Sequence, residues 1–174
     1  MKSSKRKLRL IAVGGTFDEF HKGHRVLLVK AFEVGEHVLI GVCTDDLVQK
    51  LMKPHIVATF DVRVEELKGF LRHQGLLNRA TIVPLHDSYG VTLTSEKLEG
   101  IVVSRETESR AYEINKKREA KRLRSLEIVV IEMVPAENDA PISTTRIRHL
   151  EIDREGHVLR QQHPFRGCKK ENNN

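Results

Sequence analysis

Short runs of apolar residues recur along the chain, and between them apolar residues return at helical spacing. Five runs are suited to buried strands and lie at residues 8–13, 37–43, 80–85, 101–104 and 127–134. The segments of helical spacing predict helices at residues 22–34, 62–73, 107–124 and 143–150. Strands that alternate with helices predict an α/β fold: a doubly wound, Rossmann-like parallel sheet of five strands with helices on both faces.

Two parts of the chain lack such a pattern. Residues 47–59 form a basic stretch that is broken by Pro54 and shows no clear period. Residues from Asp153 onward show neither helical nor alternating periodicity and end in a run of asparagines. Few apolar residues there offset the entropy of ordering, so this end is expected to be loose. We therefore expect one domain at residues 1–152, a tail at residues 153–174, and little loss of activity when the chain stops at Arg154.

The composition fits one charged domain. Of the 174 residues, 39% are hydrophobic and 31% charged, and 30 Lys and Arg against 24 Asp and Glu give a formal charge of +6. Nucleic acid, an anionic membrane or a phosphorylated small molecule would each suit this charge. No apolar run reaches the length of a membrane span, and the basic N-terminus lacks a cleavage-like site, so a cytoplasmic protein is expected. Cys43 and Cys168 lie far apart without metal-ligand spacing and are expected to be reduced thiols.

A group of small and imidazole side chains follows the first predicted strand. Gly14 and Gly15 end that strand, and the sequence HKGH at residues 21–24 opens the next helix. Open α/β sheets bind ligands at the carboxyl ends of their strands, and a helix start offers free N–H groups and a positive dipole end to phosphate. The two glycines allow the backbone to approach an anion closely. The alternative is a capped helix whose histidines satisfy only local backbone groups.

The pattern GTFDxxHxGH at this place resembles the HxGH superfamily of nucleotidylyltransferases. In that superfamily the second histidine and the threonine bind the α-phosphate of the nucleotide as it becomes five-coordinate. The resemblance implies these catalytic roles for His24 and Thr16. It implies nucleotide contacts for the other matching residues, which are Gly14, Gly15, Phe17, His21 and Gly23.

A second polar group precedes the last predicted helix. Residues 142–148 read ISTTRIR, so hydroxyls and guanidiniums surround a helix start and can donate to phosphate oxygens. The stretch resembles the ISSTxIR element of the same superfamily, whose first hydroxyls hold the outgoing β- and γ-phosphates. The resemblance implies ATP contacts for Ser143, Thr144, Thr145 and Arg146. The alternative is plain N-capping with two solvated arginines.

Three segments in the middle of the chain resemble the archaeal and eukaryotic type of phosphopantetheine adenylyltransferase. They read DSYG at residues 87–90, VVSRET at 102–107 and INKKR at 114–118. That type usually shows DPYG, VVSEET and INxxR, so Ser88 replaces a proline and Arg105 a glutamate. The resemblance implies an ATP contact for Ser104 and makes Arg105 a candidate phosphate contact. It implies transfer of the adenylyl group of ATP to 4'-phosphopantetheine, which gives dephospho-coenzyme A and pyrophosphate.

Other functions remain open at this point. FMN adenylyltransferase shares both signature elements and is the main enzymatic alternative. Cytidylyltransferases for glycerol phosphate or choline phosphate usually carry an RYVDE-like segment after the second strand, which this chain lacks. Nucleic-acid binding through the basic segment at residues 107–124 is an alternative of another class. Glutamates intersperse its basic residues at the spacing of helix ion pairs and few aromatics interleave, which disfavours that class.

The implied reaction needs little covalent help from the protein. The acceptor phosphate is already a nucleophile at neutral pH, so catalysis rests on positioning and on stabilising charge at the α-phosphate. Lys50 and Lys53 are candidates to approach the phosphates when a loop closes. Mg²⁺ is expected to arrive with ATP, because the sequence shows no carboxylate cluster for a metal site of its own. We expect a monomer that binds neither nucleic acid nor membrane.

Overall fold

The fold centres on one parallel sheet. The computed structural model describes residues 7–51 and 56–159. Its strands are β1 (Leu8–Gly15), β2 (Gly35–Cys43), β3 (Ala80–Leu85), β4 (Gly100–Ser104) and β5 (Glu127–Ile131). All neighbouring strands are parallel and follow the order β3-β2-β1-β4-β5. The predicted five-stranded parallel sheet is confirmed.

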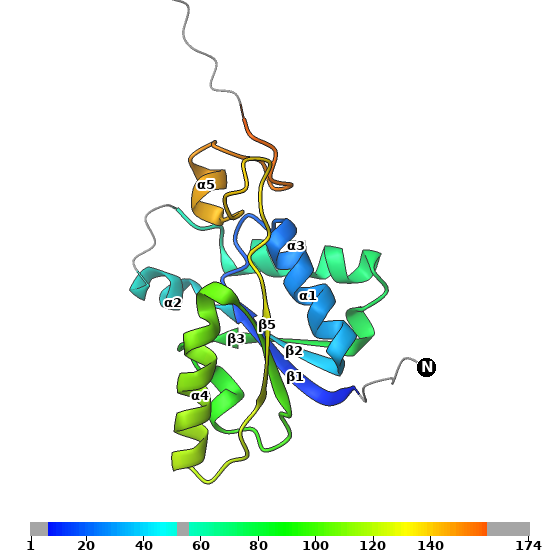
Figure 1. The fold of residues 1–174 in the computed structure, drawn as a ribbon, viewed down its shortest axis with the longest axis vertical. Helices are drawn as coiled ribbons and strands as arrows, with labels where there is room; N and C mark the ends of the chain where they lie inside the picture. Colours follow the sequence, from blue (N-terminus) through cyan, green and yellow to red (C-terminus); the bar gives the residue numbers. More distant parts are fainter. Residues whose placement is uncertain (1–6, 52–55, 160–174) are drawn as a thin grey trace, which may run out of the picture.

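Helices cover both faces of the sheet (Figure 1). They are α1 (Lys22–Val34), α2 (Asp45–Lys50), α3 (Phe60–His73), α4 (Glu108–Ala120) and α5 (Thr144–Arg148). α1 and α3 share one core with the sheet, which includes Ile11, Phe32 and Leu67. α4 packs on the other face with Ile101 and Leu126. The doubly wound arrangement is therefore confirmed as well. None of the helices in the described ranges is long and apolar enough to span a bilayer.

α2 lies in the stretch for which the sequence predicted no element. Thr44 caps this helix, because its hydroxyl oxygen accepts a hydrogen bond from the Leu47 N–H at 3.3 Å. Leu47 and Val48 are buried against Cys43. A helix of six residues presents too few turns for its apolar face to show as a period, so pattern reading missed it.

Three elements end earlier than predicted: β5, α4 and, by two residues, α5. β5 stops at Ile131, and the Val134 carbonyl accepts from the Ile142 N–H at 2.9 Å to close the loop between them. α4 stops at Ala120, and Arg122 adopts the left-handed conformation with φ 59°, which ends a helix.

The chain folds beyond the boundary expected at Asp153. Residues 151–159 form a small antiparallel hairpin, here the C-terminal hairpin, in which Ile152 pairs with Val158. Ile152 is fully buried in a small core with Ile142 of the preceding loop and Ile147 of α5. The expected loose tail is therefore wrong for residues 153–159, which fold by packing on the domain rather than by a period of their own, and the tolerance expected for a stop at Arg154 no longer follows from the fold. The rest of the expected tail, residues 160–174, lies outside the described residues.

Candidate active site

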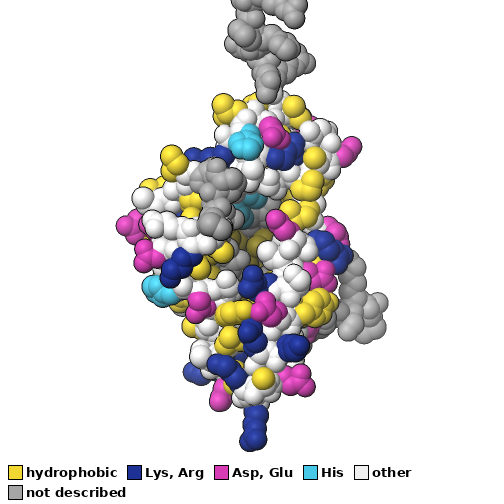
Figure 2. Space-filling view, turned by 90° about the vertical axis from the view of Figure 1, so that its left-hand side faces the viewer, with side chains coloured by type: hydrophobic (Ala, Val, Ile, Leu, Met, Phe, Trp, Pro, Cys, Tyr) yellow, Lys and Arg dark blue, Asp and Glu magenta, His cyan; other side chains and the backbone are white. Residues whose placement is uncertain are grey.

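A cleft opens at the carboxyl ends of β1 and β4. β1 has β2 on one side and β4 on the other, so the winding direction of the sheet changes at this point. β1 and β4 pair only where Ile11 meets Gly100 and Ala12 meets Ile101, and their later residues are free to diverge. The cleft has a volume of about 530 Å³, and the face shown in Figure 2 is hollowed between its upper and lower parts. Such switch points are where doubly wound sheets bind ligands.

The cleft brings both signature segments together. Its lining includes Gly14, Gly15, Thr16, Phe17, His21, Gly23 and His24 from the first segment, Ser143, Thr144 and Thr145 from the second, and Ser104 from the end of β4. These groups are far apart in the sequence and meet only through the strand order. Of the predicted contacts, Arg146, Lys50 and Arg105 are absent from the lining, and Lys53 lies outside the described residues.

The two histidines at the start of α1 orient each other. Nδ1 of His21 accepts from the Gly23 N–H at 3.1 Å, and Nδ1 of His24 lies 3.4 Å from the His21 N–H. Their rings stack with centroids 3.8 Å apart. A neutral imidazole carries one proton, so an accepting Nδ1 leaves that proton on Nε2. Each ring therefore accepts a hydrogen bond from a local backbone N–H and still offers one N–H donor. Local capping and phosphate binding, the two alternatives that the sequence left open, are thus compatible.

Burial keeps both imidazoles neutral. Desolvation, and then the positive charges of Arg25 and Arg154, lower the pKa of His21 to about 4 against a smaller opposite effect of Asp18. The pKa of His24 is lowered well below its ordinary value by burial, by His21 and by Arg25. At neutral pH the two rings are therefore uncharged donors.

Two phenylalanine rings pack against His24, and Gly23 leaves room for the ring of His21. Phe17 is fully buried and lies tilted against His24 with centroids 5.2 Å apart, while Phe20 stacks on it at 5.8 Å. The ring of Phe17 belongs to the core, so the nucleotide contact expected for this residue would have to involve its backbone. A Cβ on Gly23 would meet the His21 ring at 3.0 Å, so glycine at this position permits the ring to cap the helix.

Residues 143–145 border the cleft from the start of α5. The Ser143 hydroxyl oxygen accepts from the Arg146 N–H at 3.4 Å and caps the helix. The Thr144 hydroxyl donates to the Asp18 carbonyl at 3.1 Å. A hydroxyl that accepts in a cap keeps its proton for another partner, so capping and phosphate binding are compatible at Ser143.

Arg146 is turned away from the cleft, contrary to the expected ATP contact. Its guanidinium donates to the carbonyls of Ala140 and Pro141 at 3.1 and 2.8 Å, and it contacts Asn138 and Glu151 at 3.0 Å each. These bonds hold the loop before α5 and leave the side chain neither solvated nor directed at a nucleotide. The alternative of solvated arginines is therefore wrong for Arg146 too.

The remaining cationic candidates stand outside the cleft lining. Lys50 is exposed as the last residue of α2. Arg105 is exposed and pairs with Glu108 at 2.8 Å and with Glu132, and the hydrogen bonds that it donates to these carboxylates raise its pKa. Because Glu132 itself lines the cleft, Arg105 lies at the rim.

A buried arginine that the sequence analysis did not single out holds the base of the site. Arg63 of α3 is fully buried. Its guanidinium donates to the carbonyls of Ala58 at 2.7 Å, Thr16 at 2.7 Å and Cys43 at 2.8 Å, and pairs with Asp45 at 2.8 Å. It therefore joins the ends of β1 and β2 to α3. Its position between apolar residues of a predicted helix was the one available signal.

A buried carboxylate links the two signature segments. Asp18 is 1% exposed and accepts from the Ala58 N–H and from Arg148, each at 3.0 Å. Arg148 also pairs with Glu19 at 2.9 Å. Asp18 belongs to the GTFD motif and Arg148 ends ISTTRIR. Their ion pair therefore fixes the position of one signature segment relative to the other.

The INKKR segment is built into the fold. The Asn115 amide exchanges two hydrogen bonds with the Leu126 backbone, at 2.9 and 2.8 Å. Arg118 is fully buried and donates to the carbonyls of Thr92 and Arg124 at 2.5 and 2.7 Å. Both residues tie α4 to the neighbouring loops, which is a structural role within a family-specific motif.

A narrow apolar pocket continues from the cleft. It has a volume of about 130 Å³, lies under α4 and shares Gly14, Leu85, Ser88, Thr107 and Arg110 with the cleft. Arg110 is the only Lys or Arg among the described residues that line the cleft. Its guanidinium lies 5.7 Å from the centre of the Tyr89 ring, and no pattern in the sequence indicated that it belongs to the site.

Residues 7–51 and 56–159 contain no group of three or more His, Cys, Asp or Glu side chains placed to hold a metal ion. Besides the carboxylates of Asp87, Glu106 and Glu132, which also line it, the cleft offers a ligand hydroxyls, imidazole and backbone N–H groups and one guanidinium. This donor set suits phosphate oxygens.

A parallel doubly wound sheet with GTFDxxHxGH and ISTTRIR at one cleft defines a nucleotidylyltransferase. The cytidylyltransferase-like family matches residues 12–150. Phosphopantetheine adenylyltransferase of Methanothermobacter thermautotrophicus is 48% identical over 157 residues, which cover 90% of this chain and 93% of that protein. Its namesake from Methanopyrus kandleri is 43% identical over 142 residues, covering 82% of this chain and 90% of that protein.

A solved structure of a protein of unknown function from Archaeoglobus fulgidus agrees in fold. It has a TM-score of 0.63 and 33% identity, and the match covers 70% of this chain and 87% of that chain. The chain therefore belongs to the cytidylyltransferase-like family and, within it, to the phosphopantetheine adenylyltransferases.

Proposed function

We propose that this enzyme transfers the adenylyl group of ATP to 4'-phosphopantetheine and releases pyrophosphate and dephospho-coenzyme A. The observation that carries the proposal is the meeting of His24, Thr16 and the hydroxyls of residues 143–145 in one cleft, in a chain that belongs to the phosphopantetheine adenylyltransferases.

The reaction is a displacement at the α-phosphorus. An oxygen of the acceptor phosphate forms a bond to this phosphorus, and the bond from the phosphorus to the bridging oxygen of pyrophosphate breaks. Nε2–H of His24 and the hydroxyl of Thr16 donate to the α-phosphate oxygens as negative charge builds on them. The N-terminal dipole of α1 acts in the same direction. No side chain has to remove a proton, because the acceptor phosphate is already ionised.

The departing pyrophosphate is held from the side of α5. Ser143, Thr144 and Thr145 stand at the start of that helix and supply hydroxyl and N–H donors. Mg²⁺ is proposed to arrive with ATP, bound by the phosphates themselves and neutralising their charge. The hydroxyl, imidazole and N–H donors of the cleft suit the phosphate oxygens.

The acceptor is proposed to lie across the junction of the two pockets. The narrow pocket under α4 is lined mainly by apolar side chains, among them Val13, Leu39, Val91 and Val103, and suits the slender arm of pantetheine. Its mouth carries Arg110, whose side chain is 46% exposed and lies 3.5 Å from Glu113, and we propose that it exchanges this partner for an acceptor phosphate. The flat three-ring system of FMN would need a wider space, which makes FMN the second candidate.

The charges on α4 support a small anionic ligand rather than nucleic acid. Arg105 pairs with Glu108, Arg110 lies 3.5 Å from Glu113, and Lys117 lies 3.8 Å from it. Acidic and basic side chains are intermingled on the face shown in Figure 2. We propose a cytoplasmic enzyme that acts as a monomer and binds neither nucleic acid nor membrane.

A pyrophosphate-release assay tests the acceptor. With ATP present, 4'-phosphopantetheine, FMN and nicotinamide mononucleotide are offered in turn to the full chain. We expect fast release only with 4'-phosphopantetheine. Turnover of FMN with none of 4'-phosphopantetheine would remove the proposed acceptor and leave the family assignment unchanged.

A further inference from the structure

The C-terminal hairpin reaches back to the first turn of α1. The carbonyl of Arg154 accepts a hydrogen bond from the N–H of Lys22, the first residue of that helix, at 2.9 Å. The first N–H groups of a helix have no partner inside the helix. The hairpin supplies one partner and so contacts the turn that carries His21 and His24.

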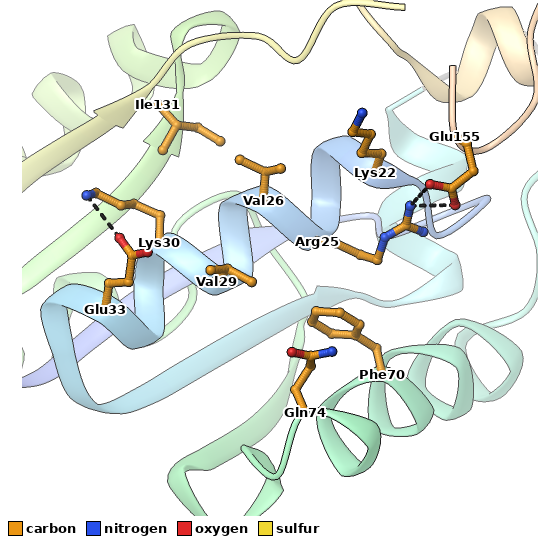
Figure 3. Close-up of a pocket in the computed structure, with 10 residues that line it drawn as sticks. All are labelled: Lys22, Arg25, Val26, Val29, Lys30, Glu33, Phe70, Gln74, Ile131 and Glu155. Carbon is orange, nitrogen blue, oxygen red and sulfur yellow. Dashed lines mark hydrogen bonds and ion pairs between the residues drawn. The ribbon is translucent and has the colours of Figure 1, made fainter. Parts of the chain in front are cut away.

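Ion pairs reinforce this contact on both sides. The guanidinium of Arg154 pairs with Glu19 at 2.8 Å and with Glu66 of α3 at 2.9 Å. Nη2 of Arg25 lies 2.6 Å from each carboxylate oxygen of Glu155, and Figure 3 shows this pair between α1 and the hairpin. The hairpin therefore connects the loop between β1 and α1, which contains Glu19, with α1 and with α3.

Glu19 joins the hairpin to α5, because arginines from both segments pair with its carboxylate. It adopts the left-handed backbone conformation with φ 47°, two residues after Phe17 with φ 53°. Non-glycine residues persist in this region only where surrounding contacts hold them, and such residues cluster at functional sites. Arg148 of α5 holds one carboxylate oxygen of Glu19 at 2.9 Å, and Arg154 holds the other at 2.8 Å.

The hairpin is itself firmly seated. Gly156, with φ 95°, packs so closely that a Cβ would meet the backbone of Ala136 at 3.1 Å. Its carbonyl accepts from the Glu137 N–H at 2.9 Å. Within the turn, the Asp153 carboxylate accepts from the backbone N–H groups of Glu155 and His157 at 2.8 and 2.9 Å.

We propose that the C-terminal hairpin positions the catalytic groups, with Arg154 as the positioning residue that acts through Glu19. The hairpin follows directly on α5, whose hydroxyls face the leaving group, and it clamps the loop and helix start that carry Thr16, His21 and His24. It thereby sets the distance between the groups at the start of α1 and the hydroxyls at the start of α5. The match to the cytidylyltransferase-like family ends at residue 150, before the hairpin, whereas the 157 residues matched by the relative from Methanothermobacter thermautotrophicus extend into it.

Kinetics of Arg154→Ala with ATP and 4'-phosphopantetheine test this role, which rests on the proposed function. Small misplacements of catalytic groups lower rates by up to about 10²-fold, so we expect kcat to fall by roughly 10-fold or more. KM for ATP should change by less than about 3-fold, since the binding groups remain. Arg9→Ala is the control, because it removes an ion pair of similar length with Glu99, 2.8 Å, at the amino ends of the strands. The control should keep the kcat of the unmodified chain.

Glu19→Gln keeps the shape of its side chain and removes the charge that Arg154 contacts. If Arg154 acts through Glu19, this variant should be slow too, and the double variant should be no slower than the slower single one. A kcat within twofold of the unmodified chain for either single variant, or fully additive losses, would overturn the positioning role. An unmodified chain that makes no dephospho-coenzyme A would reject the proposed function instead.

Discussion

Two imidazoles whose centroids lie 3.8 Å apart cannot both carry a charge without strong repulsion. Here burial and nearby arginines remove the charge from both, and the backbone bonds to Nδ1 leave Nε2–H as the free donor. A neutral donor interacts weakly with the ground state and more strongly as negative charge builds on the α-phosphate. At the scale of single residues, the HxGH pair therefore has the protonation state that its proposed role in the transition state requires.

Replacing His24 by Ala is expected to lower kcat by a factor of about 10² to 10³, the usual loss for one transition-state donor. KM for ATP should change less, because the contact strengthens mainly as charge develops. Steady-state kinetics measure both constants. His73→Ala removes an exposed imidazole at the end of α3 and should leave both unchanged. Near-normal kcat with a raised KM would mean that His24 serves binding alone.

The same burial makes the fold sensitive to acid. His21 has a folded-state pKa of about 4, below its ordinary value of 6.5, so the folded chain binds fewer protons than the unfolded chain between these values. The stability from its neutral form is present above pH 6.5 and is lost as pH falls toward 4. At about 1.4 kcal/mol per pKa unit, the fall in pKa from 6.5 to about 4 limits the loss to about 3.5 kcal/mol.

Urea unfolding between pH 7 and pH 4 measures this loss. A His21→Asn variant should show a shallower fall in unfolding free energy over that range than the unmodified chain. Equal slopes for the two chains would contradict a buried, neutral His21. Asp153 is a separate contribution, because its pKa of about 2 places its effect at lower pH.

At the scale of elements, loops carry the chemistry and buried arginines fix the loops. Arg63 holds three carbonyls at the ends of β1, β2 and the segment before α3. A buried carbonyl that loses its hydrogen-bond partner destabilises the fold. One planar guanidinium satisfies all three at once, which an ammonium group cannot do with the same geometry.

Arg63→Lys is therefore expected to lower the free energy of unfolding by about 3 kcal/mol, the size of effect seen when a buried ionic contact is broken. It should also lower kcat, because Thr16 loses the bond that holds its carbonyl. Urea unfolding and kinetics of the same preparations measure both effects. Arg72→Lys, on an exposed position of the same helix, should change stability by less than about 0.5 kcal/mol. Equal stability of the two variants would contradict the role of Arg63.

Sequence pattern sufficed where an element is long or buried. The five strands and α1, α3 and α4 follow from apolar runs and helical spacing, and the cleft follows from the place of GTFDxxHxGH after β1. α2 was too short to show a period. Arg146 was misassigned and Arg63 overlooked because a guanidinium's direction depends on carbonyls brought near only by the fold. The hairpin was missed because its stability comes from contacts with Glu19, Lys22 and Arg25.

At the scale of the whole molecule, the winding of the sheet creates the site. β1 and β4 are neighbours that part toward their carboxyl ends, and the two signature segments reach the opening from opposite ends of the chain. The cleft offers donors for phosphates, and the pocket under α4 offers an apolar channel beside it. This combination matches an acceptor that has one phosphate and one slender arm.

The central claim is adenylyl transfer from ATP to the phosphate of 4'-phosphopantetheine, and the fate of the α-phosphorus tests it most directly. ATP labelled at that atom is incubated with the full chain, Mg²⁺ and 4'-phosphopantetheine, and the products are separated and identified. We predict that the label appears in dephospho-coenzyme A, in an amount equal to the pyrophosphate released. Label that stays in AMP, or that enters a product only when FMN is the acceptor, would contradict the claim.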